Sequence, residues 1–122
     1  MAHITVKAVV NPTESADRVL KAAENLFPSL EFGEDSGALL ARGDDKSDLG
    51  AFKELLRQQQ IRDTARGFLL KRMEGDGVSF QLNKQAALMG KVNFVDFEVA
   101  LGTISVQITD KDLGSLIDWL CG

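Results

Sequence analysis

The amino-acid sequence predicts an α+β fold with a mostly antiparallel sheet, helices on one face, and the order β-α-β-β-α-α-β-β-β-α. Two observations support this prediction. Segments with apolar residues at every second position, typical of strands, alternate with segments whose apolar residues recur every three or four positions, typical of helices. Several strand segments are joined by short turns, which connect antiparallel neighbours. The chain has 122 residues, 44% of them hydrophobic, and we expect one domain over residues 1–122.

The first elements follow from local pattern. Residues 4–10 alternate and are β-branched, which predicts a strand. Thr13 is the predicted N-cap of a helix that runs until Pro28 forbids its continuation. Residues 30–32 and 38–42 then predict a hairpin, since glycines in the loop between them permit a tight reversal.

Two helices are expected in the middle of the chain and one at its end. Their predicted N-caps are Ser47, Asp63 and Asp110, whose side-chain oxygens can accept from otherwise unpaired backbone N–H groups. Between the second and third of these helices, the sequence predicts three strands, with a helical or looped insert after the first and a turn at Leu101 before the last. These strands are residues 78–82, 91–99 and 103–108.

Cysteine and histidine are too scarce for most catalytic or metal chemistry. Cys121 is the only cysteine and His3 the only histidine, and they lie at opposite ends of the chain. A disulfide within the chain, a zinc held by a cluster of cysteines and a nucleophilic cysteine paired with histidine are therefore excluded. Residues 44–48 are acidic but lack the ligand spacing of a calcium loop, and we interpret them as a solvated helix entry. We expect no enzyme activity, no metal and no cofactor.

Apolar runs of only a few residues predict no membrane-spanning helix, since about 20 are needed. The first residues alternate like a strand and lack the blocks of a signal peptide. A cytoplasmic protein without membrane contact is expected.

Charge is distributed unevenly along the chain. The formal net charge is −4, which argues against coating nucleic acid through bulk positive charge. Residues 53–91, however, hold eight basic and four acidic side chains, a balance of +4, and the rest of the chain is at −8. The middle of the chain is therefore the expected place for contacts with an anionic partner.

Basic side chains gather on the predicted middle helices. They are Arg57, Arg62, Arg66, Lys71 and Arg72. Because Arg62 and Arg66 are four residues apart, they share a helix face, and arginine forms paired hydrogen bonds with phosphate. We call these five residues the basic edge. The sequence leaves a second interpretation open, a solvated helix face on which Asp63 pairs with Arg62 or Arg66.

A second polar stretch spans residues 82–94. It contains Asn83, Lys84, Gln85, Lys91 and Asn93. The amides can contact base edges or sugar hydroxyls, beside lysines that can contact phosphates. Asparagine also caps helices and forms turns; we favour that role for Asn93, while both roles stay open for Asn83.

Several nucleic-acid-binding signatures are missing. The chain has no tyrosine and one tryptophan, so a stacking platform for unpaired bases is not expected. No Gly-Xaa-Xaa-Gly clamp flanked by helices, phosphate-binding loop or dinucleotide fingerprint is present. Recognition of RNA by its shape would fit this composition better.

Four segments resemble uncharacterised protein family two-zero-one, a set of small archaeal proteins. They are residues 12–14, 57–66, 82–94 and 101–106. The resemblance implies a fold similar to that of the ribosomal protein that binds the small RNA of the large subunit. It also implies RNA binding and an association with the exosome, and no enzyme activity.

The predicted function is therefore binding of structured RNA, in RNA processing or degradation, with exosome- or ribosome-associated proteins as further partners. The predicted contacts are Arg57, Arg62, Arg66, Lys71, Arg72, Asn83, Lys84, Gln85 and Lys91. The alternative is a protein-interaction module or small homodimeric adaptor without a nucleic-acid ligand.

Overall fold

The computed structural model describes residues 2–96 and 102–122. The strands are β1 (His3–Val9), β2 (Gly33–Asp35), β3 (Ala38–Gly43), β4 (Met73–Glu74), β5 (Gly77–Asn83), β6 (Phe94–Val95) and β7 (Thr103–Thr109). The helices are α1 (Ala16–Leu26), the 3-10 helix η1 (Lys46–Leu49), α2 (Gly50–Gln58), α3 (Arg62–Lys71), α4 (Lys84–Leu88) and α5 (Leu113–Cys121).

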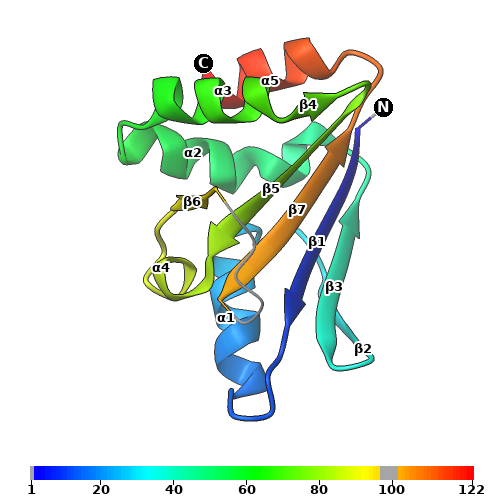
Figure 1. Ribbon diagram of the computed structural model, residues 1–122, viewed down its shortest axis with the longest axis vertical. Coiled ribbons are helices and arrows are strands. Elements are labelled where there is room, and N and C mark those ends of the chain that lie inside the picture. Colours follow the sequence, from blue (N-terminus) through cyan, green and yellow to red (C-terminus); the bar gives the residue numbers. More distant parts are fainter. Residues whose placement is uncertain (1, 97–101) are drawn as a thin grey trace.

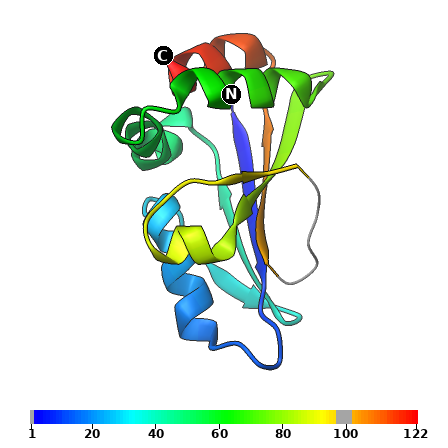
Figure 2. The ribbon, with the colours of Figure 1, turned by 60° about the vertical axis from the view of Figure 1, so that its left-hand side comes forward.

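The described strands form one sheet in the order β2-β3-β1-β7-β5-β4, with β6 paired beside the end of β5. Every pairing among them is antiparallel. The α-helices lie behind the sheet and beyond its upper end in Figure 1, and the turned view of Figure 2 leaves the opposite face free of helices. The prediction of an α+β fold with an antiparallel sheet and helices on one face is confirmed.

Alternation gives the long strands two different faces. In β1, Ile4, Val6 and Ala8 are at most 1% exposed, and the residues between them point to the helix-free face. β5 and β7 follow the same pattern. One face of the sheet thus packs against the core, and the other points away from it.

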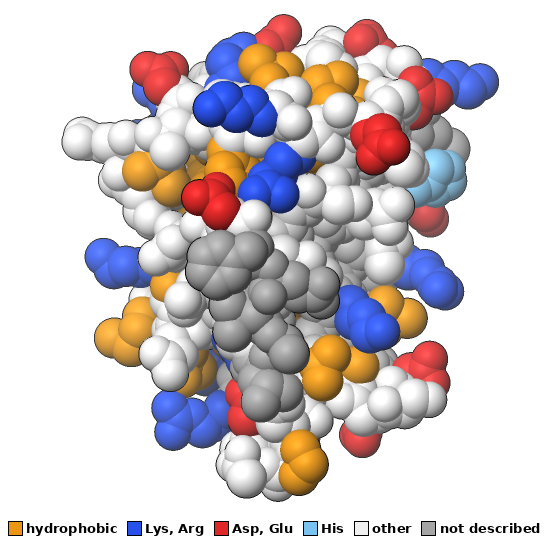
Figure 3. All heavy atoms as spheres, in the orientation of Figure 1, with side chains coloured by type: hydrophobic (Ala, Val, Ile, Leu, Met, Phe, Trp, Pro, Cys, Tyr) orange, Lys and Arg blue, Asp and Glu red, His pale blue; other side chains and the backbone are white. Residues whose placement is uncertain are grey.

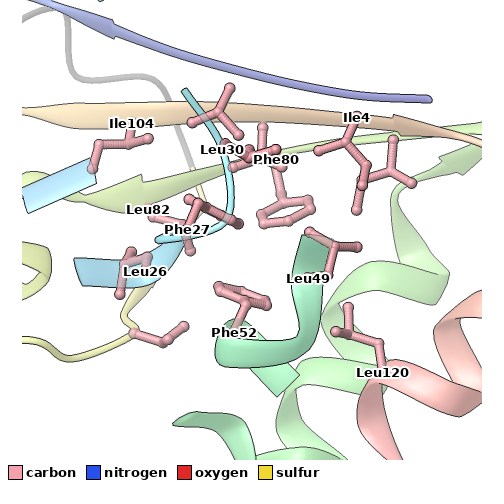
Figure 4. Packing of buried hydrophobic residues seen from close by; sticks show 14 of the residues in the cluster. Ile4, Leu26, Phe27, Leu30, Leu49, Phe52, Phe80, Leu82, Ile104 and Leu120 are labelled. Carbon is pink, nitrogen blue, oxygen red and sulfur yellow. The ribbon is translucent and has the colours of Figure 1, made fainter. Parts of the chain in front are cut away.

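The core fills the space between sheet and helices. Phe27 at the end of α1 stacks on Phe52 of α2 with ring centroids 5.3 Å apart, and Phe80 of β5 lies 6.1 Å from Phe52 (Figure 4). All three side chains are at most 1% exposed. Aromatic packing therefore joins the first helix, the middle helices and the centre of the sheet.

Two predicted N-caps in the first half are wrong. Thr13 lies in a turn, because the N–H of Glu14 donates to the carbonyl of Asn11 (2.9 Å) and Glu14 Oε1 accepts from the Asn11 N–H (3.0 Å). α1 begins only after this turn. Ser47 lies inside η1, which Asp45 caps by accepting from the Ser47 N–H at 3.2 Å.

The other two predicted caps are also wrong. α3 begins at Arg62, so Asp63 is already inside its first turn, where the carboxylate favours the positive end of the helix. α5 is capped by Asp112, which accepts from the Ser115 N–H at 3.4 Å, while Asp110 accepts from the Asp112 N–H at 2.8 Å. At α5, two nearby aspartates with similar capping ability explain the error, whereas the N-cap of α3 is Ile61, which makes no side-chain cap hydrogen bond.

The strands differ from prediction at three places. Residues 30–32 are not a strand, because a two-residue turn with positive φ at Ser36 and Gly37 pairs β2 with β3 instead. The short β4 was not predicted. Of the strand predicted over residues 91–99, the described residues 91–96 form only β6; residues 97–99 and the turn predicted at Leu101 lie outside the described part.

Candidate nucleic-acid interface

The residues predicted to contact RNA lie in two separate places. Arg57 is in the last turn of α2, Arg62, Arg66 and Lys71 are in α3, and Arg72 is the C-cap of α3. α3 packs beside α5 at the top of the view in Figure 1, whereas α4 packs against α1 lower down. The nine predicted residues therefore do not form one continuous edge.

Three arginines of the basic edge, Arg57, Arg66 and Arg72, already have acidic partners. Arg57 pairs with Glu54 one turn earlier in α2, and Arg66 pairs with Asp118 of α5. These pairs lie at the surface, with the Arg57 side chain 57% exposed, so both guanidinium groups keep contact with water. The interpretation in which Asp63 pairs locally with Arg62 or Arg66 has no matching ion pair among the described residues.

Arg72 is the most firmly held of these arginines. Its Nη2 donates to the Asp96 carbonyl at 2.9 Å and lies 3.7 Å from the Asp96 carboxylate. The guanidinium also sits 4.3 Å from the centre of the Phe68 ring. Stacking and a backbone hydrogen bond fix its orientation, and the side chain stays 31% exposed.

Arg62, Lys71 and Lys91 are the more available cations. All three are exposed, and none takes part in an ion pair within the described ranges. Arg62 donates to the Gly122 carbonyl at 3.3 Å. Lys91 precedes Val92, whose N–H and carbonyl are both hydrogen-bonded by the Gln59 side chain at 2.7 and 3.0 Å. Lys91 is thereby held near the end of α2.

A shallow hollow of about 520 Å³ lies beside α3. Its rim includes Lys71 and Arg72, but also Asp63 and Asp96. Two positive and two negative side chains line the hollow, so it carries no net positive charge that would attract a phosphate.

Asn83 and Lys84 are occupied by the fold. The Asn83 side chain caps α4, accepting from the Ala86 N–H at 2.9 Å. Lys84 is 6% exposed; its Nζ donates to the Val9 carbonyl at 2.7 Å and to Glu14 Oε1 at 3.1 Å. A phosphate could reach this ammonium only by displacing the Glu14 carboxylate. The position of Lys84 is explained by its role in holding α4 against β1 and the turn before α1. Gln85 is exposed.

The acidic partners are what the sequence analysis missed. The pairing of Arg57 with Glu54 follows from a spacing of three residues in a helix and was recognisable. The contacts of Arg66 with Asp118 and of Lys84 with Glu14 join residues 52 and 70 apart, and no local pattern indicates them.

No helix in the described ranges combines the length and hydropathy needed to cross a bilayer. Nor do the described parts bring together three or more His, Cys, Asp or Glu side chains in a metal-binding arrangement.

Fold and surface together define an antiparallel α+β domain that presents cations from its helix layer. A family model described as RNA binding matches residues 3–109. The UPF0201 protein of Sulfolobus acidocaldarius is 38% identical over 126 residues, covering 98% of this chain and 87% of that protein. The UPF0201 protein of Methanothermobacter thermautotrophicus is 40% identical, covering 98% and 91%. The chain belongs to the UPF0201 family, the uncharacterised archaeal family that its sequence resembles.

Solved structures agree. The crystal structure of an uncharacterised UPF0201 protein matches with a TM-score of 0.86 and 37% identity over 98% of this chain and 92% of that one. The UPF0201 protein from Methanococcus jannaschii gives 0.85 and 34%, over 98% and 99%.

Proposed function

We propose that this chain binds structured RNA by contacting phosphates through Arg57, Arg62, Lys71, Arg72 and Lys91, with Arg66 and Gln85 adding contacts. The match of the RNA-binding family model to residues 3–109 carries the proposal. The exposure of Arg62, Lys71 and Lys91 supports it, since such a cation can neutralise a phosphate and release the counterion condensed on the RNA without first breaking an ion pair. Lys84, and Asn83 with it, support the local fold rather than the ligand.

The test is fluorescence anisotropy of labelled hairpin, duplex and single-stranded RNA, at low and at physiological salt. We expect hairpin or duplex to bind with micromolar or tighter affinity, and Arg62→Glu combined with Lys71→Glu to weaken binding across sequences. Lys21→Glu is the matched control, because Lys21 is an exposed lysine of α1, outside the proposed contacts. Unchanged affinity in the double variant would remove α3 from the interface, and absence of binding by the unmodified chain would refute the function.

The alternative of a protein-interaction module or homodimer would draw on exposed apolar side chains. Those among the described residues are Val9, Leu70 and Met89, at 41%, 48% and 76% exposure. They come from β1, α3 and the end of α4, three different elements. RNA therefore remains the better supported partner; a mass that rises with concentration in sedimentation would favour the alternative.

A further inference from the structure

The helix-free face of the sheet is polar except at Val9, Ala38 and Leu40, and its four long strands carry no acidic side chain there. β1 and β3 contribute Thr5, Lys7 and Arg42, and β5 and β7 contribute Ser79, Gln81, Ser105 and Gln107. The chain has 18 acidic residues, yet among the described strands only Asp35 on β2 and Glu74 on β4 point to this side, at opposite edges of the sheet.

Figure 3 looks onto this face. Over the strands in the right half of the view, many side chains are white, with blue and some orange ones among them and red ones towards the upper and lower margins. We call this surface the open sheet face, meaning the outward positions of β1, β3, β5 and β7.

Its hydroxyl and amide groups can both donate and accept hydrogen bonds. The register places Ser79 opposite Gln107, and Gln81 opposite Ser105. The Ser105 hydroxyl donates to Gln81 Oε1 at 2.8 Å, which orients that amide and leaves its nitrogen as a donor. Groups of this kind suit the 2′-hydroxyl of ribose, which also donates and accepts.

The side chains of this face indicate whether it suits single-stranded or double-helical RNA. No Phe, Tyr or Trp occupies an outward position of the four strands, and the His3 ring lies only at the end of β1, so the face offers no row of rings on which successive unpaired bases could stack. Hydroxyl and amide side chains spread over neighbouring strands fit the wide, shallow minor groove of an RNA double helix, which displays the 2′-hydroxyls.

Cations flank this face on two sides. Lys7 and Arg42 lie towards the β3 side, and Arg72, bonded to Asp96 just after β6, lies towards the β5 side. Four strands about 4.8 Å apart separate the two sides by about 14 Å. Phosphates bordering a groove laid across the strands would therefore meet positive charge at both margins.

We propose that the open sheet face contacts the minor groove of an RNA double helix through its hydroxyl and amide side chains, with Lys7 and Arg42 on bordering phosphates. This proposal deepens the proposed function and rests on it. It makes β5 and β7 part of the interface and predicts a preference for RNA over DNA.

The test compares a labelled RNA duplex with a DNA duplex of the same sequence, using the full chain. Ser79→Glu should weaken RNA binding at least about tenfold, since it adds a negative charge facing phosphates. Ser29→Glu, at an exposed serine in the turn after α1, is the matched control and should change affinity by less than about twofold. Gln107→Ala, which adds no charge, should reduce the preference for the RNA duplex over DNA. Circular dichroism and thermal melting verify that each variant is folded.

Three results separate failure of this proposal from failure of the proposed function. If Arg62→Glu with Lys71→Glu weakens RNA binding but Ser79→Glu and Gln107→Ala leave it unchanged, the open sheet face is not the contact and the proposed function stands. Equal binding of the two duplexes by the unmodified chain would overturn recognition of the 2′-hydroxyl. No RNA binding at all, even at low salt, would overturn both.

Discussion

The Lys84 ammonium is a buried charge, and burying a charge costs free energy unless it is paired. Its ammonium joins α4 to the end of β1 through the Val9 carbonyl and to the turn before α1 through Glu14. Removing the ammonium leaves the Glu14 carboxylate, whose side chain is 26% exposed, without its cation. The cost should be below the roughly 3–5 kcal/mol of a fully buried pair, because Glu14 can still reach water.

We therefore expect Lys84→Ala to lower the free energy of unfolding by about 2 kcal/mol. Urea denaturation followed by circular dichroism measures it. The matched control is Lys91→Ala, at an exposed lysine seven positions on, which should stay within about 0.5 kcal/mol of the unmodified chain. Equal effects of the two substitutions would show that the buried ion pair does not stabilise the fold.

The same pair makes stability depend on pH. Burial alone would raise the pKa of Glu14, but hydrogen bonds from the Asn11 backbone N–H and Lys84, together with the lysine charge, outweigh it and hold the pKa below its ordinary value of 4.5. Because the pKa is lower in the folded chain, the carboxylate stabilises the fold above pH 4.5. This stabilisation is lost as the pH falls through the folded-state pKa.

Urea denaturation at a series of pH values from neutral to well below 4.5 tests this. Glu14→Gln removes the titrating group, so its stability should fall less steeply over the acidic part of the series. Parallel curves for the two proteins would mean that other carboxylates account for the acid sensitivity.

At the scale of elements, the contact between α3 and α5 restrains a predicted RNA contact. Arg66 and Asp118 have side chains 36% and 68% exposed, and a surface pair of this kind contributes at most about 1 kcal/mol to stability. Asp118→Asn keeps the shape of the side chain and removes its charge. Arg66 would then be freed for phosphate, and a repulsive carboxylate would be lost from the proposed interface.

We expect Asp118→Asn to raise affinity for hairpin RNA by roughly three- to tenfold and to change stability by less than about 1 kcal/mol. Anisotropy and urea denaturation measure the two effects. Asp17→Asn, at an exposed aspartate of α1, removes the same charge outside the proposed contacts and is the control. If both variants gain affinity equally, the change reflects total charge, and Arg66 does not contact RNA.

The sequence predicted best the elements in which the apolar residues repeat regularly over many positions. The six alternating residues 103–108 sufficed to predict β7, and Leu113, Leu116, Ile117 and Leu120 lie inward on α5 as their spacing requires. Helix starts were wrong where two capping residues stand close together, as Asp110 and Asp112 do. Which of the two accepts the helix N–H depends on the path of the incoming chain, which tertiary packing sets.

The candidate site was less predictable than the fold. The sequence located the cations of α2 and α3, since basic spacing on a helix is local. It did not show that Lys84 is buried against Glu14 or that Arg66 faces Asp118, because the partners meet only after the chain has folded. The polar residues of β5 and β7 were recognised as strand, but alternation alone does not tell which face the helices cover.

For the whole molecule, the location of charge matters more than its total. With a net charge of −4, the chain gains no long-range attraction to RNA. Any affinity must come from local contacts, at the exposed cations of α2 and α3, Lys91, and the open sheet face. Two such surfaces respond differently to salt, because only phosphate contacts release counterions.

The salt dependence of binding therefore measures how many phosphates the chain contacts. If Arg57, Arg62, Lys71, Arg72 and Lys91 each neutralise one phosphate, the logarithm of the binding constant should fall with the logarithm of salt concentration with a slope of roughly −3.5 to −4.5, and contacts by Lys7 and Arg42 would steepen it further. Arg62→Glu with Lys71→Glu should flatten this slope by roughly 2, whereas Lys21→Glu should leave it unchanged. Anisotropy titrations over a series of salt concentrations give the slopes. A steep slope that persists in the double variant would contradict contacts by α3 and assign the phosphates to other cations, Lys7 and Arg42 beside the open sheet face first.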